Sequence, residues 1–355
     1  MLRYKEIKNL LLQELSSMSP GDRLLSRPQL CKKLDTTRAT LDKAIKELEQ
    51  EGFLSSKNGS GTYLVELFES PSYHTSSWGI IVPDIMYTVY SGLVRGLENV
   101  AQEHDISIII CNSDNQPQKQ AQYIKRLVLS HVSGIIIVPI ITDSIRENFQ
   151  LYNQLIDIRI PIIFCNRSVE GINVPVVTSN NFYGGYIATK HLLEHGYRKI
   201  AYIAEKKYAT SNERCQGYIS ALIEAGIDIK RKLIVFLGSE QNYEQQIKRL
   251  FEIEPELDGA FCFNDRVAEG ILNALSCMKK NIPEDFGIIG YDNTEICERT
   301  NPCLTSVSYK NIEIGNKAGE LMWKITNHQY TPDFQYYLFQ PNIIVRNSCL
   351  GKVRH

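Results

Sequence analysis

The chain has 355 residues, of which 43% are hydrophobic and 22% are charged, and this composition is typical of an ordinary globular protein with two or three domains. Its formal net charge of −1 at pH 7 excludes a strongly polybasic protein. No apolar run reaches the roughly 18 residues that a membrane span requires, and the polar N-terminal stretch lacks a signal-peptide pattern. We therefore expect a cytoplasmic protein with no membrane association.

The first part of the chain predicts three helices. Apolar residues recur along residues 2–16 at helical spacing, and Pro20-Gly21 ends this segment. Ser26 can cap a second helix. Thr36-Thr37 precedes a third, whose apolar residues all fall on one face: Leu41, Ala44, Ile45 and Leu48.

A β-hairpin follows the third helix. Two short β-rich runs, residues 53–55 and 62–65, flank the sequence Asn58-Gly59-Ser60-Gly61. Asn and Gly tolerate the positive φ angles of tight hairpin turns, so this sequence predicts the tip of the hairpin. A helix followed by a glycine-tipped hairpin indicates a winged helix-turn-helix.

The sequences PGDRLLSRPQL, TTRATLDKAIKELEQEGFL and NGSGTYLV resemble the DNA-binding domain of the GntR family of bacterial regulators. The resemblance implies a recognition helix that presents its N-terminal half to base edges in the major groove, while flanking groups contact phosphates. The residues it assigns to DNA are Arg27, Thr37, Arg38, Thr40, Lys43, Lys46, Asn58, Gly59 and Gly61. Pro28 and Asp42 stand where the family often has Arg. We expect Arg27 to replace the cation missing at Pro28, whereas Asp42 cannot bind phosphate but can accept from a cytosine amino group.

Residues 1–66 hold 11 Lys or Arg and 9 Asp or Glu, a small positive excess. We expect one such head to bind DNA weakly and a homodimer to be required on a two-fold operator. Residues 67–77 are polar and contain Pro71, which predicts a linker.

Residues 78–355 alternate short Ile- and Val-rich runs with amphipathic helical segments. This pattern predicts parallel sheets covered by helices, and the number of strands predicts two α/β lobes. We place the lobes at 78–176 with 307–335 and at 177–306 with 336–350. The overall prediction is an α/β protein: a winged helix-turn-helix joined to a two-lobed domain of the periplasmic-binding-protein type.

Polar residues follow several of the predicted strands, and ligands of open α/β sheets bind beyond the carboxyl ends of strands. Motifs such as NSDNQPQKQAQYI, IPIIFCNR, ERCQGYISALIEAGI, AFCFNDRVAEGIL and IPEDFGIIGYDN resemble the effector domain of the LacI/GalR family. A GntR-type head on such a domain resembles the arabinose-repressor (AraR) subgroup of sugar-responsive regulators.

These strand ends, together with the resemblance, give the candidate ligand residues. Arg214, Asn264 and Asp292 match the family's sugar contacts, and Asn166 stands where the family often has Asp. The remaining candidates are Asp84, Tyr87, Tyr90, Asp114, Arg167, Tyr243, Asp265 and Tyr309. Carboxylates, amides, an Arg fork and aromatic faces are the groups that a hydroxyl-rich ligand requires.

The sequence thus indicates a transcriptional regulator, and we expect a repressor of a carbohydrate operon. We expect it to bind a double-stranded DNA operator as a homodimer. A small sugar, such as arabinose or another monosaccharide, would control this binding.

The alternatives are a purine or sugar-phosphate effector, a sugar-binding protein, or an enzyme. Of the cations that a phosphate would require in the pocket, only Arg167, Arg214 and Arg266 are evident. Common phosphate-binding and nucleophile motifs are missing, as is zinc-ligand spacing, so we expect no enzymatic activity, no cofactor and no metal.

Overall fold

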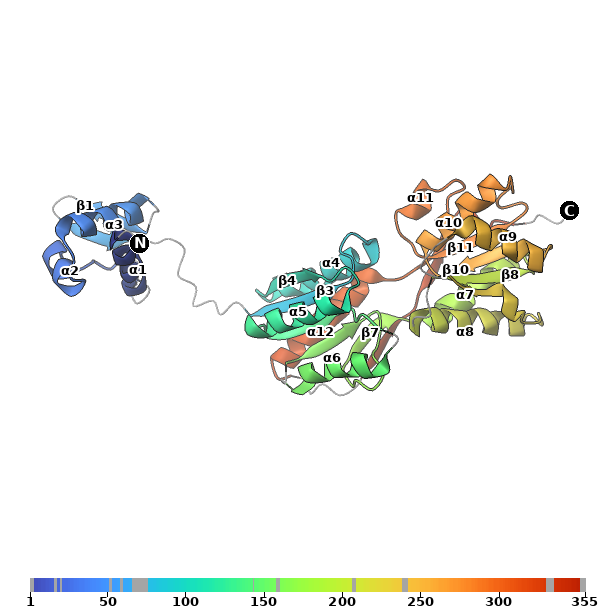
Figure 1. Cartoon of the computed structure of the whole chain (residues 1–355), viewed down its shortest axis with the longest axis horizontal. Coiled ribbons are helices and arrows are strands. Elements are labelled where there is room, and N and C mark those ends of the chain that lie inside the picture. Colours follow the sequence, from blue (N-terminus) through green and yellow to red (C-terminus); the bar gives the residue numbers. More distant parts are fainter. Residues whose placement is uncertain are drawn as a thin grey trace. The chain divides into compact units, whose positions relative to one another are not determined.

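The structure, a computed structural model of the chain, describes residues 3–15, 18–19, 21–50, 53–57, 60–65, 76–142, 144–157, 160–205, 209–237, 242–329 and 335–351 (Figure 1). The chain forms two compact units, Met1–Thr75 and Ser76–His355. Most of the predicted linker lies outside the described residues, but its last residue, Ser77, begins a strand. No helix among the described residues is both long enough and apolar enough to cross a membrane.

The first unit is the predicted winged helix-turn-helix. It consists of α1 (Arg3–Leu15), α2 (Arg27–Lys33), α3 (Arg38–Gln50), β1 (Leu54–Lys57) and β2 (Gly61–Leu64). The Thr37 hydroxyl accepts from the backbone N–H of Thr40 at 3.4 Å, as expected of a residue at the start of a helix. The two strands pair antiparallel, with Leu54 opposite Leu64. The apolar faces of the three helices close over one core that includes Leu11, Leu30 and Leu48.

The first lobe of the second unit is built on a sheet with the strand order β13-β7-β6-β5-β3-β4, in which every pairing is parallel. Its elements are β3 (Ser77–Val82), α4 (Thr88–Glu103), β4 (Ser107–Asn112), α5 (Pro117–Leu129), β5 (Gly134–Ile137), α6 (Ile145–Asp157), β6 (Ile162–Cys165), β7 (Val176–Ser179), α12 (Asn311–Thr326) and β13 (Tyr336–Phe339). Successive strand residues face opposite sides: Ile80 packs with α4 and α12, whereas Ile81 packs with α5 and α6.

The second lobe is built on a sheet with the order β14-β12-β11-β10-β8-β9, in which only β14 runs antiparallel among the described strands. Its elements are α7 (Asn181–Glu194), β8 (Ile200–Ala204), α8 (Ala209–Glu224), a 3₁₀ turn (Arg231–Leu233), β9 (Ile234–Phe236), α9 (Tyr243–Ile253), β10 (Gly259–Cys262), α10 (Asp265–Cys277), β11 (Gly287–Asp292), α11 (Ile296–Arg299), β12 (Thr305–Ser308) and β14 (Asn342–Ile344). Helices α7 and α8 pack on one face of the sheet, and α9 and α10 on the other.

The chain passes between the lobes after β7, after β12 and after β13. Our predicted lobe boundaries were a few residues too early. They placed β13 in the second lobe, whereas β13 pairs with β7 in the first, and they cut β7 and β12 internally. A residue that cannot continue a strand follows each of these strands within two positions. Asn180 caps α7 directly after β7. Lys310, with φ of +63°, follows β12, and Pro341 follows β13. The apolar patterns alone do not mark these stops.

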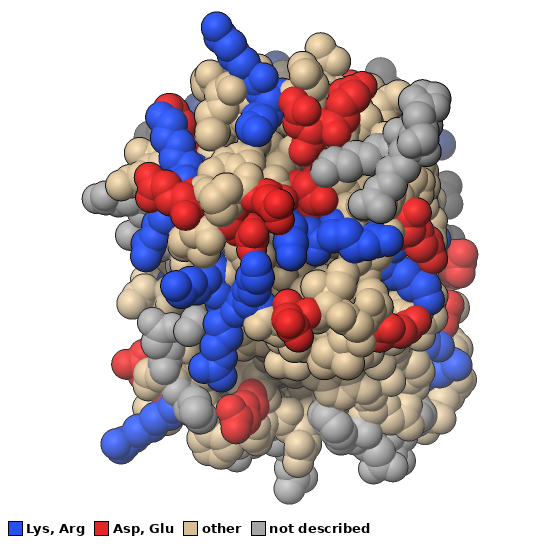
Figure 2. All heavy atoms as spheres, turned by 90° about the vertical axis from the view of Figure 1, so that its right-hand side faces the viewer, with Lys and Arg blue, Asp and Glu red and all other residues tan. Residues whose placement is uncertain are grey.

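Charges are mixed on the face of the molecule in Figure 2. Lys and Arg side chains there alternate with Asp and Glu, and they form no continuous basic area. This distribution agrees with the near-neutral total charge of the chain. A long basic surface for nucleic acid is therefore not a feature of this face.

Candidate functional site: a polar cavity between two lobes

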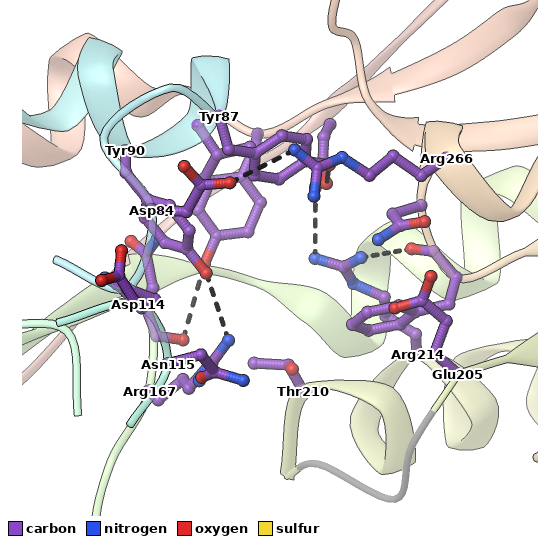
Figure 3. A pocket seen from close by; sticks show the side chains of 17 residues that line it. Asp84, Tyr87, Tyr90, Asp114, Asn115, Arg167, Glu205, Thr210, Arg214 and Arg266 are labelled. Atoms are coloured by element: carbon purple, nitrogen blue, oxygen red, sulfur yellow. Dashed lines mark hydrogen bonds and ion pairs between the residues drawn. The ribbon is translucent and has the colours of Figure 1, made fainter. Parts of the chain in front are cut away.

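A cavity of about 500 Å³ lies between the two lobes of the second unit (Figure 3). Its walls come from the carboxyl ends of strands in both sheets, as the strand-end pattern predicted. Ten of the predicted ligand residues line it: Asp84, Tyr87, Tyr90, Asp114, Asn166, Arg167, Arg214, Asn264, Asp292 and Tyr309. The volume falls in the range typical of small-molecule sites.

The wall from the first lobe combines aromatic faces with a buried amide. The Tyr87 and Tyr90 rings meet edge to face, with centroids 5.8 Å apart, and Arg167 donates to the Tyr90 hydroxyl at 3.1 Å. Asn166 is 5% exposed and adopts a positive φ of +65°, a conformation that Asn tolerates better than most residues. Asn166 lines the cavity, and its Oδ1 atom is buried without a hydrogen-bond partner among the described residues.

The wall from the second lobe centres on Arg214. This side chain is buried and donates from Nε to Asn181 Oδ1 at 3.0 Å and from Nη1 to the carbonyl of Phe263. Its guanidinium lies 3.4 Å from the centre of the Tyr291 ring. Packing on an aromatic face together with hydrogen bonds from fixed acceptors holds the guanidinium in one orientation.

Asp292 is the buried carboxylate of this wall. Its Oδ1 atom lies 3.6 Å from Arg214 Nη2, and its Oδ2 atom accepts a hydrogen bond from the Tyr87 hydroxyl. Burial raises the pKa of Asp292 to about 7, because the loss of hydration outweighs the opposing effect of Arg214. The same burial, aided by the charge of Asp292, raises the pKa of Tyr87 well above its usual value.

Two predicted ligand residues do not line the cavity. Asp265 is fully buried beneath it and accepts hydrogen bonds from Thr294, through both backbone and hydroxyl, and from the Ser306 hydroxyl. Its carboxylate therefore joins the start of α10 to the segment after β11 and to β12. The error arose because adjacent residues at a strand end face opposite ways: Asn264 borders the cavity and Asp265 points into the lobe.

Tyr243 also lies elsewhere. Its ring packs on α10 at Gly270, where an added Cβ would come within 2.4 Å of it. The Tyr243 hydroxyl interacts with the Glu205 carboxylate, and burial raises the pKa of this phenol to about 12. Tyr243 therefore lies outside the cavity wall, and its hydroxyl interacts with the lining residue Glu205.

The sequence analysis missed the lining residues Glu205, Thr210 and Phe263, and it counted Arg266 among the pocket's cations without listing it as a ligand residue. Glu205 follows β8 directly, so the strand-end rule that found Asp84 would have found it as well. Arg266 lies in the first turn of α10 and reaches across to Asp84 at 3.4 Å. That reach depends on how the lobes face each other, which no local pattern encodes.

In the first unit, the predicted DNA residues of α3 lie on its exposed side. The Arg38 side chain is 80% exposed, and the Thr37 and Thr40 hydroxyls lie 2.9 Å apart. Lys43 and Lys46 are exposed too, with the Lys43 ammonium 4.3 Å from the centre of the Tyr4 ring. This side of α3 thus presents hydroxyls and cations together.

Arg27 forms an ion pair with Asp42 at 3.0 Å and donates to the Thr62 hydroxyl at 2.9 Å. This contact joins α2, α3 and the second wing strand, and it accounts for an acid at position 42. Gly61 begins β2 with φ of +130°, and an added Cβ would come within 2.5 Å of Arg23. Asn58 and Gly59 lie outside the described residues.

Comparisons with known proteins agree with this architecture. Residues 3–64 match the bacterial regulatory proteins of the gntR family, and residues 189–349 match the periplasmic binding protein-like domain. An arabinose metabolism transcriptional repressor from Geobacillus stearothermophilus is 24% identical, over 98% of this chain and 97% of its own length. The transcriptional repressor PurR from Actinobacillus pleuropneumoniae is 29% identical over 77% of this chain and 81% of its length.

Among solved structures, the transcription regulator CcpA of Lactococcus lactis superposes with a TM-score of 0.67 at 30% identity, over 77% of this chain and 99% of that one. This structural similarity covers nearly the whole CcpA chain, whereas the match to the gntR family lies in the N-terminal unit, Met1–Thr75.

Proposed function

We propose that this chain, which belongs to the LacI-type family of bacterial transcription regulators and carries a GntR-type winged-helix head, binds a neutral monosaccharide in the cavity between its lobes. The chain is a DNA-binding transcriptional repressor, and the bound sugar controls its hold on the operator. The observation that carries the choice of ligand is the chemistry of the cavity wall.

The arginines of the cavity are already paired with acceptors of the protein. Arg214 faces Asp292 and the carbonyl of Phe263, Arg266 faces Asp84, and Arg167 donates to Tyr90. A phosphate group would require cations free to form charge-assisted hydrogen bonds. Arg214 and Arg266 face acidic side chains, whereas Arg167 donates to the neutral oxygens of Tyr90 and Pro139. Acidic groups, amides and aromatic rings beside these arginines instead suit a ligand that carries hydroxyls and no charge.

Within this proposal, the buried Oδ1 atom of Asn166 accepts from a sugar hydroxyl and thereby loses its unsatisfied state. Asp292 and Arg214 bind hydroxyls from the second lobe. The rings of Tyr90 and Phe263 cover the C–H face of the sugar. Arabinose is the first candidate, since the relative that matches nearly the whole chain is named for arabinose metabolism.

A purine or a sugar phosphate remains the second candidate. The 29% identity to PurR, a repressor of the same family, is the observation that favours an effector of another class. A purine would stack on the same tyrosines, and its ring nitrogens would hydrogen-bond to the same amides and carboxylates. The two candidates can be distinguished by whether a neutral sugar, or instead a purine or sugar phosphate, raises the melting temperature of the protein.

Tyr309 provides a route from the ligand to the chain segments between the lobes. Its hydroxyl lies 3.2 Å from the Thr178 hydroxyl, and its ring lines the cavity directly after β12. Asn180, at another of these segments, bonds through its backbone N–H to the carbonyl of Phe339 at 2.8 Å. A ligand that changes how the lobes are held against each other therefore acts on all three chain passages together.

A homodimer that binds a two-fold operator in the cytoplasm completes the proposal. Edge strand β4 supports it, because Ile109 and Ile110 are 38% and 51% exposed on a strand that pairs on one side only among the described strands. In the head, Arg38, Thr37, Thr40, Lys43 and Lys46 contact bases and phosphates, and Gly61 brings the wing close to the DNA.

A thermal-shift screen of the full chain against pentoses, hexoses, their phosphates and purines tests the ligand. A ligand at one hundred times its dissociation constant stabilises the folded state by about 2.7 kcal/mol. We expect one neutral sugar to raise the melting temperature of the wild type and not of Asp292→Ala. A response only to phosphates or purines, or an equal response in the variant, would refute the assignment.

A further inference from the structure

Among the described residues, three side-chain contacts join the two lobes along one side of the cavity. Asp84 pairs with Arg266 at 3.4 Å, the Tyr87 hydroxyl donates to Asp292, and the Thr88 hydroxyl donates to Glu295. The first member of each pair lies at the start of α4 or just before it. The second lies at the start of α10 or α11, or at the end of β11.

Tyr87 is the centre of this cluster. The Arg266 guanidinium lies 4.2 Å from the centre of the Tyr87 ring, so one cation touches both Asp84 and the ring (Figure 3). Tyr87 and Asp292 are only 9% and 8% exposed, although they belong to different lobes. A hydrogen bond from a buried phenol to a buried carboxylate is worth more than the same bond in water.

This bond uses a group that the proposed sugar also requires. Tyr87 donates to Oδ2, whereas Arg214 Nη2 lies 3.6 Å from Oδ1, beyond hydrogen-bond distance. A ligand hydroxyl that binds at Oδ2 must displace the Tyr87 hydroxyl or share its acceptor, and in either case it gains less than it would from an unoccupied oxygen.

We propose that Tyr87 is a built-in competitor of the ligand: its hydroxyl occupies Asp292 and, with the Asp84–Arg266 and Thr88–Glu295 pairs, forms a latch that holds the lobes together until the ligand replaces it. The competitor role rests on the proposed sugar function, whereas the latch itself does not. The latch sets the ligand concentration at which the regulator responds, because the ligand must break protein contacts before it makes its own.

The competitor role is tested with Tyr87→Phe in the full chain. This variant retains the ring beneath Arg266 and removes only the hydroxyl. Calorimetric titration with the sugar found in the thermal-shift screen should show roughly tenfold tighter binding than to the wild type. If Tyr87 acted only as a ligand contact, the variant would bind the sugar with unchanged or weaker affinity, and either result overturns the proposal.

Tyr186→Phe is the matched control. The Tyr186 hydroxyl also donates to a carboxylate, that of Glu224 at 2.5 Å, but on α7 and α8 away from the cavity. Loss of this hydrogen bond should leave the sugar affinity unchanged. An equal gain in affinity in both variants would assign the effect to a general loosening of the fold and overturn the competitor role.

The latch is tested without any ligand by reversing its charges. Asp84→Arg and Arg266→Asp each place like charges opposite one another, and the double variant restores an opposite pair. In hydrogen exchange of the full chain measured by mass spectrometry, peptides covering residues 83–90 and 291–296 should exchange several-fold faster in each single variant and return toward wild type in the double one.

Single variants that exchange no faster than the wild type, or a double variant as fast as the singles, would overturn the latch. If no sugar binds any form of the protein, the proposed function fails, and the exchange measurement still decides whether the latch exists.

Discussion

Asp292 shows how one residue can combine strain, burial and charge at a binding wall. It ends β11 with φ of +101°, in the left-handed region that L-residues rarely adopt, and it is 8% exposed. Arg214 faces it from α8 and Arg266 from α10, while Asp265 adds a second buried acid nearby. Burial is the largest influence and raises the pKa of Asp292 to about 7.

This raised pKa predicts a pH dependence of stability. Asp has a pKa of 3.8 when solvated, so between pH 4 and 7 the unfolded chain has lost a proton that the folded chain retains. The contribution of Asp292 to stability is therefore full below about pH 4 and declines as the pH rises to 7, by at most about 1.4 kcal/mol per pH unit.

Asp292→Asn removes this decline and preserves the backbone, because Asn also tolerates positive φ. Urea unfolding of the wild type and the variant at pH 5, 6, 7 and 8 measures this difference in stability. Tryptophan fluorescence reports unfolding of the second unit, since Trp78 and Trp323 both belong to it. The stability of wild type relative to the variant should fall from pH 5 to 7 and then level off. A constant difference across the series would contradict the raised pKa.

At the residue scale, the polar groups of the cavity could be predicted where they follow a strand, as with Asn166 and Asp292. The direction of each side chain could not, and this is why Asp265 proved buried and Tyr243 remote. The pairing of Arg266 with Asp84 could not be predicted, because Asp84 comes from the other lobe.

Helix pairs in both lobes approach closely at glycines. In the first lobe, a Cβ on Gly96 would lie 2.1 Å from the carbonyl oxygen of Ile312 in α12. In the second, a Cβ on Gly217 of α8 would lie 2.0 Å from the carbonyl oxygen of Phe182 in α7. Both contacts are with backbone, which cannot rotate away as a side chain can. These glycines are therefore requirements of the packing.

Gly217→Ala tests this packing and its effect on the site. Arg214 lies less than one turn before Gly217, so displacing α8 from α7 also displaces the guanidinium that faces Asp292. We expect the folded second unit to lose roughly 1–3 kcal/mol and the sugar affinity to fall. Gln216→Ala, an exposed position on the same turn, should change neither quantity. Equal behaviour of the two variants in urea unfolding would disprove the role of the glycine.

At the element scale, helical and strand periodicity predicted the winged head, the two α/β lobes and most of their elements. The lobe boundaries were less well predicted, because strands β7, β12 and β13 each extend toward the neighbouring lobe before the chain breaks. A single capping Asn or a single Lys with positive φ ends such a strand without changing the pattern of apolar residues, so this pattern does not predict where the strand ends.

At the scale of the whole molecule, the account requires that ligand and DNA influence each other through one chain. The cavity lies in the unit Ser76–His355, and α3, which we propose to read the DNA, lies in the unit Met1–Thr75. The ligand can change DNA affinity only by its preference between two arrangements of the protein, typically about 1–3 kcal/mol. A family resemblance could be predicted from sequence motifs, but the size of this coupling could not.

The most direct test is the affinity of the full chain for an operator duplex, obtained by in vitro selection, with and without the sugar. In fluorescence anisotropy, saturating sugar should weaken DNA binding by roughly 5- to 150-fold. Asp292→Ala should bind the duplex as the wild type does and ignore the sugar, whereas Arg38→Ala should lose the duplex and still bind the sugar. An operator affinity that saturating sugar leaves unchanged, in a protein shown to bind both, would contradict the account.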